Sequence, residues 1–342
     1  MKHHTTRWAA LLVCALLFAA CGSNTSQQAP ATATSGPVAP PALPSAGKVS
    51  ATLFAIGGSM DPGYIFGIAA DDTAVWVHNV AQGTVLRVDP KTNQVVATIP
   101  VGHGQGDVGL EGGFVWVLNH DDSTISKIDP QTNTVVDTIA LPPPAGFLAV
   151  SPGAIWVSAK ASGVVRKIDP QTDQVAASFS SSNGPTWMAF AGGSIWVCNR
   201  DSTTSGVTRL DSMTTKVQAN IDISSGKGYS CDGIAASGNA IWAELLDGDQ
   251  TFDVGLARID PATNKVVATI LLQQSNVTSA LAADAQGVWS AKPDMGLVRI
   301  DPTTNHAAGF LGMSGACGVA VGAGAVWVLN SEGTLLRITP AS

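Results

Sequence analysis

Short apolar runs alternate with turn-forming polar, Gly and Pro residues along almost the whole chain after residue 48. One copy of the pattern consists of the segments 115–119, 128–133 and 135–139. The tryptophan of the first segment recurs with successive gaps of 40, 40, 40, 46, 47 and 38 residues, at Trp76, Trp116, Trp156, Trp196, Trp242, Trp289 and Trp327. Repeats of this period, built from short strands and turns, are typical of propeller blades. We therefore expect an all-β, seven-bladed β-propeller.

Each repeat divides into four apolar runs, which predicts four-stranded blades. In the first repeat the runs are 68–70, 75–77, 85–88 and 95–99, with turn residues between them. The turn between the third and fourth runs reads Asp-Pro-x-Thr-Asn or Asp-Pro-x-Thr-Asp in five repeats, at 89–93, 129–133, 169–173, 260–264 and 301–305. Proline presets the second turn position, and the Asp side chain can accept a hydrogen bond from the backbone two residues on. We interpret these aspartates as structural rather than catalytic.

The last repeat ends at 336–340 and lacks a fourth apolar run. Residues 48–53, Lys-Val-Ser-Ala-Thr-Leu, match the fourth run Lys-Val-Val-Ala-Thr-Ile at 265–270. We therefore expect an N-terminal strand to complete the last blade and to close the ring. Closure of this kind removes an exposed sheet edge.

The first 47 residues differ in composition from the repeats. Lys2 and Arg7 precede an apolar run at 8–20, a pattern typical of an export signal. This run is shorter than the roughly 20 apolar residues of a membrane span. The small residues before Cys21 resemble a bacterial lipoprotein box, in which Phe18 replaces the usual Leu, and the resemblance implies that Cys21 carries a lipid.

Residues 21–47 are rich in Pro, Ala, Ser and Thr, which predicts a disordered tether. The expected domains are thus a signal peptide at 1–20, the tether at 21–47 and the propeller at 48–342. Such a protein would be exported and anchored to a membrane, facing the periplasm or the cell exterior.

The charge balance argues against nucleic acid as a partner. The chain has a formal net charge of -7, and removal of residues 1–20 would leave 16 basic and 25 acidic residues, a balance of -9. Non-specific binding to nucleic acid depends on clustered Lys and Arg that neutralise phosphates. We therefore expect a monomeric protein with a protein, glycan or small-molecule ligand.

The repeat Trp-Val-x-Asn followed by Asp-Pro-x-Thr-Asn-x-Val-Val-x-Thr-Ile resembles the YVTN-type propeller repeats of bacterial periplasmic and surface proteins. The resemblance covers about 290 of the 342 residues. The related virginiamycin B lyase-like streptogramin lyases are metal-assisted enzymes with an acidic residue after the blade tryptophan and paired His and Glu near the channel. This chain departs from both features, because Asn stands three residues after Trp in four blades and His306 falls in a turn.

The loops between second and third strands share one face with the blade-to-blade loops, and we expect function on that face. The spacing from Trp to the turn Asp is 13 residues in three blades but 15 in the fourth and 18 in the fifth. Divergent loops on a constant scaffold commonly carry function. The expected ligand-binding rim is mostly acidic and consists of Trp187, Arg200, Asp201, Asp232, Glu244, Asp247, Asp249 and Asp253. Such a rim favours a cationic or polyhydroxylated partner.

Aromatic and cysteine residues add two expectations for the same face. Phe66, Phe147 and Trp187 lie just before first strands and could form an aromatic channel mouth or pack in the core. Cys198 and Cys231 fall at strand ends on this face of neighbouring blades, and an exported protein matures in an oxidising compartment. We expect a Cys198–Cys231 disulfide and a free Cys317.

Three functions stay open from the sequence. The leading interpretation is a non-catalytic binding or scaffold module without a cofactor. The first alternative is a lyase or lactonase with a divalent metal held by His103, Asp107 and His120, since imidazole and carboxylate suit a zinc-like ion; these residues could equally be solvated loop residues. The second alternative is a purely structural component of the cell envelope.

Overall fold

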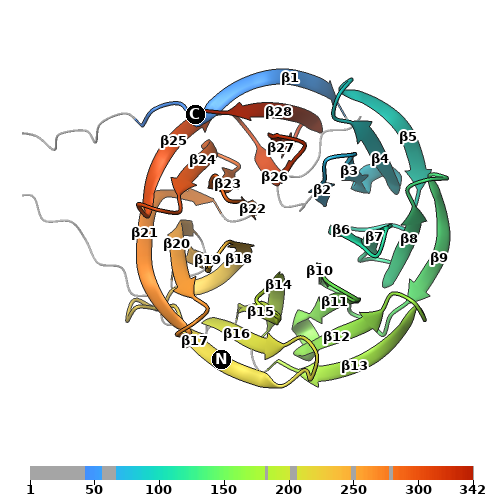
Figure 1. Ribbon diagram of the computed structural model, residues 1–342, viewed down its shortest axis with the longest axis horizontal. Helices are drawn as coiled ribbons and strands as arrows, with labels where there is room; N and C mark the ends of the chain where they lie inside the picture. Colours follow the sequence, from blue (N-terminus) through green and yellow to red (C-terminus); the bar gives the residue numbers. More distant parts are fainter. Residues whose placement is uncertain are drawn as a thin grey trace, which may run out of the picture. The chain divides into compact units, whose positions relative to one another are not determined.

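The computed structural model describes residues 43–55, 67–181, 184–200, 206–247, 252–276 and 280–341. The expected signal peptide, the lipidated Cys21 and nearly all of the tether lie outside the described residues. Within residues 43–342 the described strands form seven four-stranded antiparallel sheets arranged around a central axis (Figure 1). The all-β, seven-bladed propeller expected from the repeats is confirmed.

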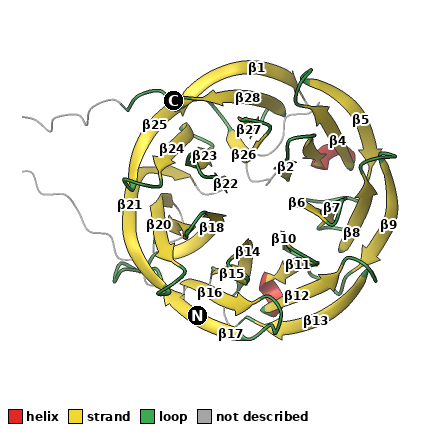
Figure 2. Cartoon of the chain, viewed as in Figure 1, coloured by secondary structure: helices red, strands yellow, loops and turns green. Residues whose placement is uncertain are grey.

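Strands make up nearly all of the regular structure in the described part of the chain, which also has two short 3-10 turns at Val80–Gln82 and Lys160–Ser162 (Figure 2). Among the described residues no helix is long and apolar enough to cross a membrane. The innermost strand of each blade lies next to the axis. These strands are β2 (Ile68–Ala70), β6 (Val108–Glu111), β10 (Phe147–Ser151), β14 (Pro185–Ala191), β18 (Ser230–Ser237), β22 (Ala280–Ala283) and β26 (Ala316–Gly322).

The second strand of each blade carries the repeated tryptophan, and the third pairs with it. The second strands are β3 (Val75–Asn79), β7 (Phe114–Asn119), β11 (Ala154–Ala159), β15 (Ser194–Asn199), β19 (Ala240–Leu246), β23 (Val288–Lys292) and β27 (Ala325–Asn330). The third strands are β4 (Thr84–Asp89), β8 (Thr124–Asp129), β12 (Val164–Asp169), β16 (Gly206–Asp211), β20 (Phe252–Asp260), β24 (Gly296–Asp301) and β28 (Thr334–Pro340).

The fourth strand of each blade forms the outer edge of the ring. These strands are β5 (Gln94–Pro100), β9 (Thr134–Ala140), β13 (Gln174–Ser180), β17 (Val217–Asp222), β21 (Lys265–Asn276), β25 (His306–Gly312) and, for the seventh blade, β1 (Gly47–Ala55). β1 pairs with β28 in the register Gly47↔Pro340 and Val49↔Ile338. The first strand in sequence thus completes the last blade, as the match between residues 48–53 and 265–270 predicts.

The seven tryptophans form the core between blades, and each is at most 1% exposed. A Lys or Arg of the third strand stands opposite each one and covers its ring; Arg87, for example, pairs with Trp76 and lies 5.3 Å from the ring centroid. The Arg87 guanidinium also donates to the Pro130 carbonyl at 2.6 Å and to Asn133 Oδ1 at 2.9 Å, both in the next blade. One side chain therefore joins the core of its own blade to the turn of its neighbour.

The Asp-Pro turns are structural elements, as their composition predicts. Asp129 Oδ1 accepts a hydrogen bond of 2.7 Å from the Gln131 N–H, two residues on. The last turn residue is left-handed, with φ of 56° at Asn133, a conformation that Asn tolerates better than most residues. Lys127 forms an ion pair of 2.9 Å with Asp173 at the corresponding turn position of the third blade. The Asn or Asp that recurs at this turn position thus serves backbone geometry and contact between blades.

Candidate functional site

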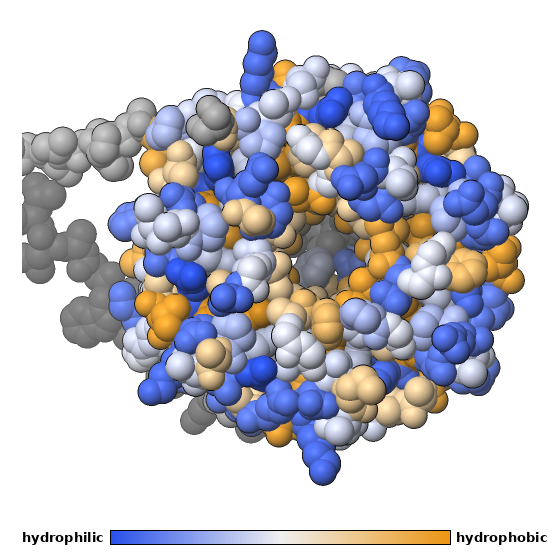
Figure 3. Space-filling view, in the orientation of Figure 1, coloured by the Kyte–Doolittle hydropathy of each residue, from blue (hydrophilic) through white to orange (hydrophobic). Residues whose placement is uncertain are grey.

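A cavity of about 170 Å³ lies on the propeller axis, and all seven innermost strands contribute to its wall. Figure 3 shows the hollow at the centre of the ring, with apolar side chains around it. Seven of the wall residues occupy the same position in their blades. Each comes one residue before the residue that pairs with the blade tryptophan across the two strands. This apolar ring consists of Ile68, Val108, Leu148, Met188, Ile234, Leu281 and Val319.

The residues that precede the apolar ring by one position in each blade form a second level of the channel. We name this level the channel bowl. Asp107, Phe147 and Trp187 occupy this position in the second, third and fourth blades. The other four blades have small residues there, namely Gly67, Gly233, Ala280 and Gly318. One side of the bowl therefore carries a carboxyl and two aromatic side chains, and the other side carries small residues, with the Glu244 side chain next to Gly233.

Asp107 is held in place by its own blade and by the next one. Its backbone carbonyl accepts from the Leu118 N–H at 3.0 Å, and its Oδ2 accepts from the Leu148 N–H at 2.7 Å. Burial raises the pKa of Asp107 to about 7, although the hydrogen bond from Leu148 opposes this shift. Asp107 can therefore change its charge near neutral pH.

The two aromatic side chains of the bowl form a pair. The ring centroids of Phe147 and Trp187 are 4.5 Å apart, and the ring planes are inclined by 42°. Trp187 also packs against the apolar cluster between the fourth and fifth blades, which contains Cys198 and Cys231. Packing against this cluster and against Phe147 thus holds Trp187 in position.

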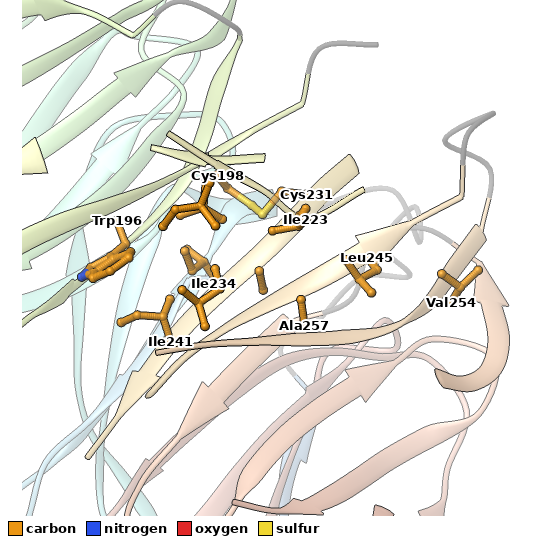
Figure 4. Packing of buried hydrophobic residues seen from close by; sticks show 13 residues of the cluster. Trp196, Cys198, Ile223, Cys231, Ile234, Ile241, Leu245, Val254 and Ala257 are labelled. Atoms are coloured by element: carbon orange, nitrogen blue, oxygen red, sulfur yellow. A yellow bond between two sulfur atoms is a disulfide. The ribbon is translucent and has the colours of Figure 1, made fainter. Parts of the chain in front are cut away.

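Cys198 and Cys231 form the disulfide that the sequence predicts, with a Cα–Cα distance of 5.4 Å. It joins β15 to β18 inside the cluster that Figure 4 shows. Cys317 is a buried free thiol, and burial raises its pKa to about 12. The disulfide therefore lies directly behind the part of the wall that carries Trp187.

A family of repeats of unknown function, DUF6923, matches residues 19–200, which is more than half of the chain. The chain belongs to the DUF6923 repeat family. No curated protein matches this chain significantly. Among solved structures, it is similar to a chain named Kuenenia stuttgartiensis hydrazine synthase, with a TM-score of 0.70 and 16% sequence identity over 83% of this chain and 97% of that chain. At this identity the similarity shows the propeller fold alone.

Two acidic residues of the expected rim are buried in the DUF6923 propeller. Glu244 is fully buried and accepts from the Ser290 hydroxyl at 2.8 Å, between the fifth and sixth blades. Asp253 is 1% exposed and forms a buried ion pair with Lys292 of the sixth blade. The expectation that both belong to an exposed rim is therefore wrong. The insertion of the fifth blade lengthens the β19–β20 ladder, with Leu246 opposite Asp253, instead of forming only a loop.

The other rim residues have different positions. Arg200 forms an ion pair of 2.7 Å with Asp232, whose side chain is 6% exposed. Asp247 lies at the end of the β19–β20 hairpin, where its N–H donates to the Phe252 carbonyl at 2.9 Å. Asp201 and Asp249 lie outside the described residues, and Trp187 is the rim residue that reaches the channel.

The structure does not bring His103, Asp107 and His120 together. His103 Nδ1 lies 3.4 Å from Asp122 Oδ2, and His120 Nδ1 lies 3.1 Å from Asp121 Oδ1, both at the surface, whereas Asp107 faces the channel. Among the described residues no group of three or more His, Cys, Asp or Glu side chains could hold a metal ion. These donors do not form the site that the metal-dependent alternative requires.

Sequence reasoning missed the channel bowl as a unit, although it singled out each of its larger residues. A signal was present: alignment of the repeats on tryptophan places Asp107, Phe147 and Trp187 at one position, 9 residues before Trp in each of these blades. The aligned position holds small residues in the other four blades. Such a pattern, small residues in some repeats and large polar or aromatic ones in others, indicates a site that departs from the scaffold.

Proposed function

We propose that this protein is a non-catalytic binding module whose ligand enters the channel bowl. The observation that supports the proposal most is the asymmetry of the bowl, with a carboxyl and an aromatic pair on one side and small residues opposite. An apolar cavity with a few convergent polar groups and a perturbed pKa is the usual form of a ligand site. The cavity of about 170 Å³ suits a small molecule.

A plugged channel tests this proposal. Ala280 lines the side of the bowl that carries small residues, and Ala280→Phe should fill cavity space opposite the aromatic pair. Native mass spectrometry after incubation with a small-metabolite extract should detect a bound molecule in the wild type and none in the variant. The fold of the variant is checked by circular dichroism. Absence of any adduct on the wild type, or equal adducts on both proteins, would remove the channel as the binding site.

We further propose that the module is exported and held at the cell envelope by a lipid on Cys21. This proposal is supported by the charged start, the apolar run and the Cys at the head of a Pro-rich segment. Replacement Cys21→Ser should release the protein from membranes into the soluble exported fraction in detergent phase separation. Partition of the variant into the detergent phase would contradict the lipid anchor.

A further inference from the structure

We propose that the channel bowl binds a small organic cation, an ammonium ion with a compact apolar body, between Asp107 and the Phe147–Trp187 pair. The inference rests on the proposed function as a ligand-binding channel and gives the chemical class of the ligand. Three independent features of the bowl support it: an unneutralised carboxyl, an aromatic face without a cation, and an apolar floor.

The first feature is the charge of Asp107. Among the described residues, the salt bridges do not include Asp107, and its Oδ2 is occupied by a neutral backbone N–H from Leu148. The strands that pack against β6 near this level carry one titratable side chain, His78 on β3, and burial lowers its pKa. His78 is therefore neutral at pH 7 and does not balance the carboxylate. At the far end of β6, Glu111 adds a further negative charge and accepts from the Gly153 N–H.

The second feature is that no described Lys or Arg lies over the ring of Trp187. Each of the seven blade tryptophans has a Lys or Arg over its ring, at distances from 4.8 to 5.5 Å. Trp187 is the tryptophan of the described part of the chain that has no protein cation over it. The negative face of an indole attracts an ammonium ion, most strongly when water is excluded. A ligand cation would thus occupy the position that a Lys or Arg occupies in every blade core.

The third feature is the space around these groups. The apolar ring lies next to the bowl, and the small residues Gly233 and Ala280 line the opposite wall of the cavity. A compact alkyl group attached to the ammonium would contact the apolar ring while the charge stays level with Asp107. Asp107 is the one charged side chain among the residues that line the described cavity.

The test compares choline with its neutral carbon isostere 3,3-dimethyl-1-butanol by isothermal titration calorimetry on the purified protein. Choline should bind at least about tenfold more tightly than the isostere, since each tenfold is 1.4 kcal/mol. Asp107→Asn should remove this preference, and Trp187→Leu should weaken choline at least about fivefold, the effect of 1 kcal/mol. The matched control Asp72→Asn, at an exposed turn, should change nothing.

The pH dependence gives a second readout. Choline affinity should rise between pH 6 and 8 as Asp107 ionises, and affinity for the isostere should stay constant. Equal affinities for the two probes, or choline binding that Asp107→Asn leaves unchanged, would overturn the cation site while the Ala280→Phe experiment still decides whether the channel binds ligands at all. Failure of choline to bind the wild type would overturn the inference as well.

Discussion

Asp107 shows how a single side chain can conflict with the fold around it. The repeats need a small or apolar residue at its position, and burial there raises the pKa of its carboxyl to about 7. Between the usual Asp pKa of 3.8 and this value the folded protein holds a proton that the unfolded chain has lost. The free energy of unfolding therefore falls as the pH rises from about 4 to 7. Retention of such a residue is typical of a functional position.

We predict that Asp107→Asn stabilises the protein at pH 8, because the amide needs no charge in the channel wall. The melting temperature should rise by about 2–4 °C, roughly the effect of 1 kcal/mol in a large domain. At pH 4 the difference should shrink, since wild-type Asp107 is then protonated. Asp72→Asn serves as the exposed control. A destabilised Asp107→Asn protein at pH 8 would contradict the assignment of a partly buried, unneutralised carboxyl.

The sequence singles out Asp107 but not its neighbourhood. In a strand, a shift of one residue exchanges the two faces, so a loop residue just before β6 cannot be assigned to the channel or to the surface from spacing alone. The same limit explains Glu244, which stands two residues after Trp242 and lies against Ser290 of the next blade. The composition of this segment predicts an acidic surface, and the burial of Glu244 becomes visible only from the packing of the fifth blade against the sixth.

Strands and turns are the scale at which the sequence predicts most. The Asp-Pro turns, the four strands of each blade and the disulfide between β15 and β18 all follow from the alignment of repeats on tryptophan. The insertion in the fifth blade does not follow, because added residues can form a loop or lengthen a hairpin. Here Asp253 finds Lys292 on the next blade, and the ladder between β19 and β20 continues outward.

The turn asparagines allow the contact between blades to be measured. Asn133 and Asn93 are both left-handed, with φ of 56° and 59°, but Asn133 Oδ1 accepts from Arg87, whereas Asn93 Oδ1 has no partner among the described residues. Replacement of either by Ala should cost about 1 kcal/mol for the left-handed backbone. Asn133→Ala should cost about 1 kcal/mol more for the lost hydrogen bond.

Urea denaturation of the two variants measures this difference directly. Both variants lose the same left-handed Asn, so the backbone cost is the same in each. The difference between their free energies of unfolding therefore measures the hydrogen bond between Asn133 and Arg87. Equal losses of stability in Asn93→Ala and Asn133→Ala would show that this bond between blades contributes nothing net.

At the scale of the whole molecule, pairing of β1 with β28 joins the two ends of the repeat array. We predict that a protein beginning at residue 56, which lacks β1, melts several degrees lower or aggregates, because β28 then presents an open edge. A protein beginning at residue 43 keeps β1 and is the control. The comparison uses differential scanning calorimetry and size-exclusion chromatography. Identical melting temperatures and monomer profiles for the two proteins would refute the closing role of β1.

The pairing of β1 with β28 also sets an order of events during biosynthesis. β1 is the first propeller strand to be translated, yet its partner is the last, so β1 stays without a partner until residues 334–340 have emerged. The chain that must loop back spans nearly the whole propeller, which makes closure slow and late. A prematurely terminated chain cannot close, and it keeps an open edge that chaperones and proteases can engage. Ring closure therefore distinguishes full-length from truncated chains, because β1 finds its partner strand only after β28 has been synthesised.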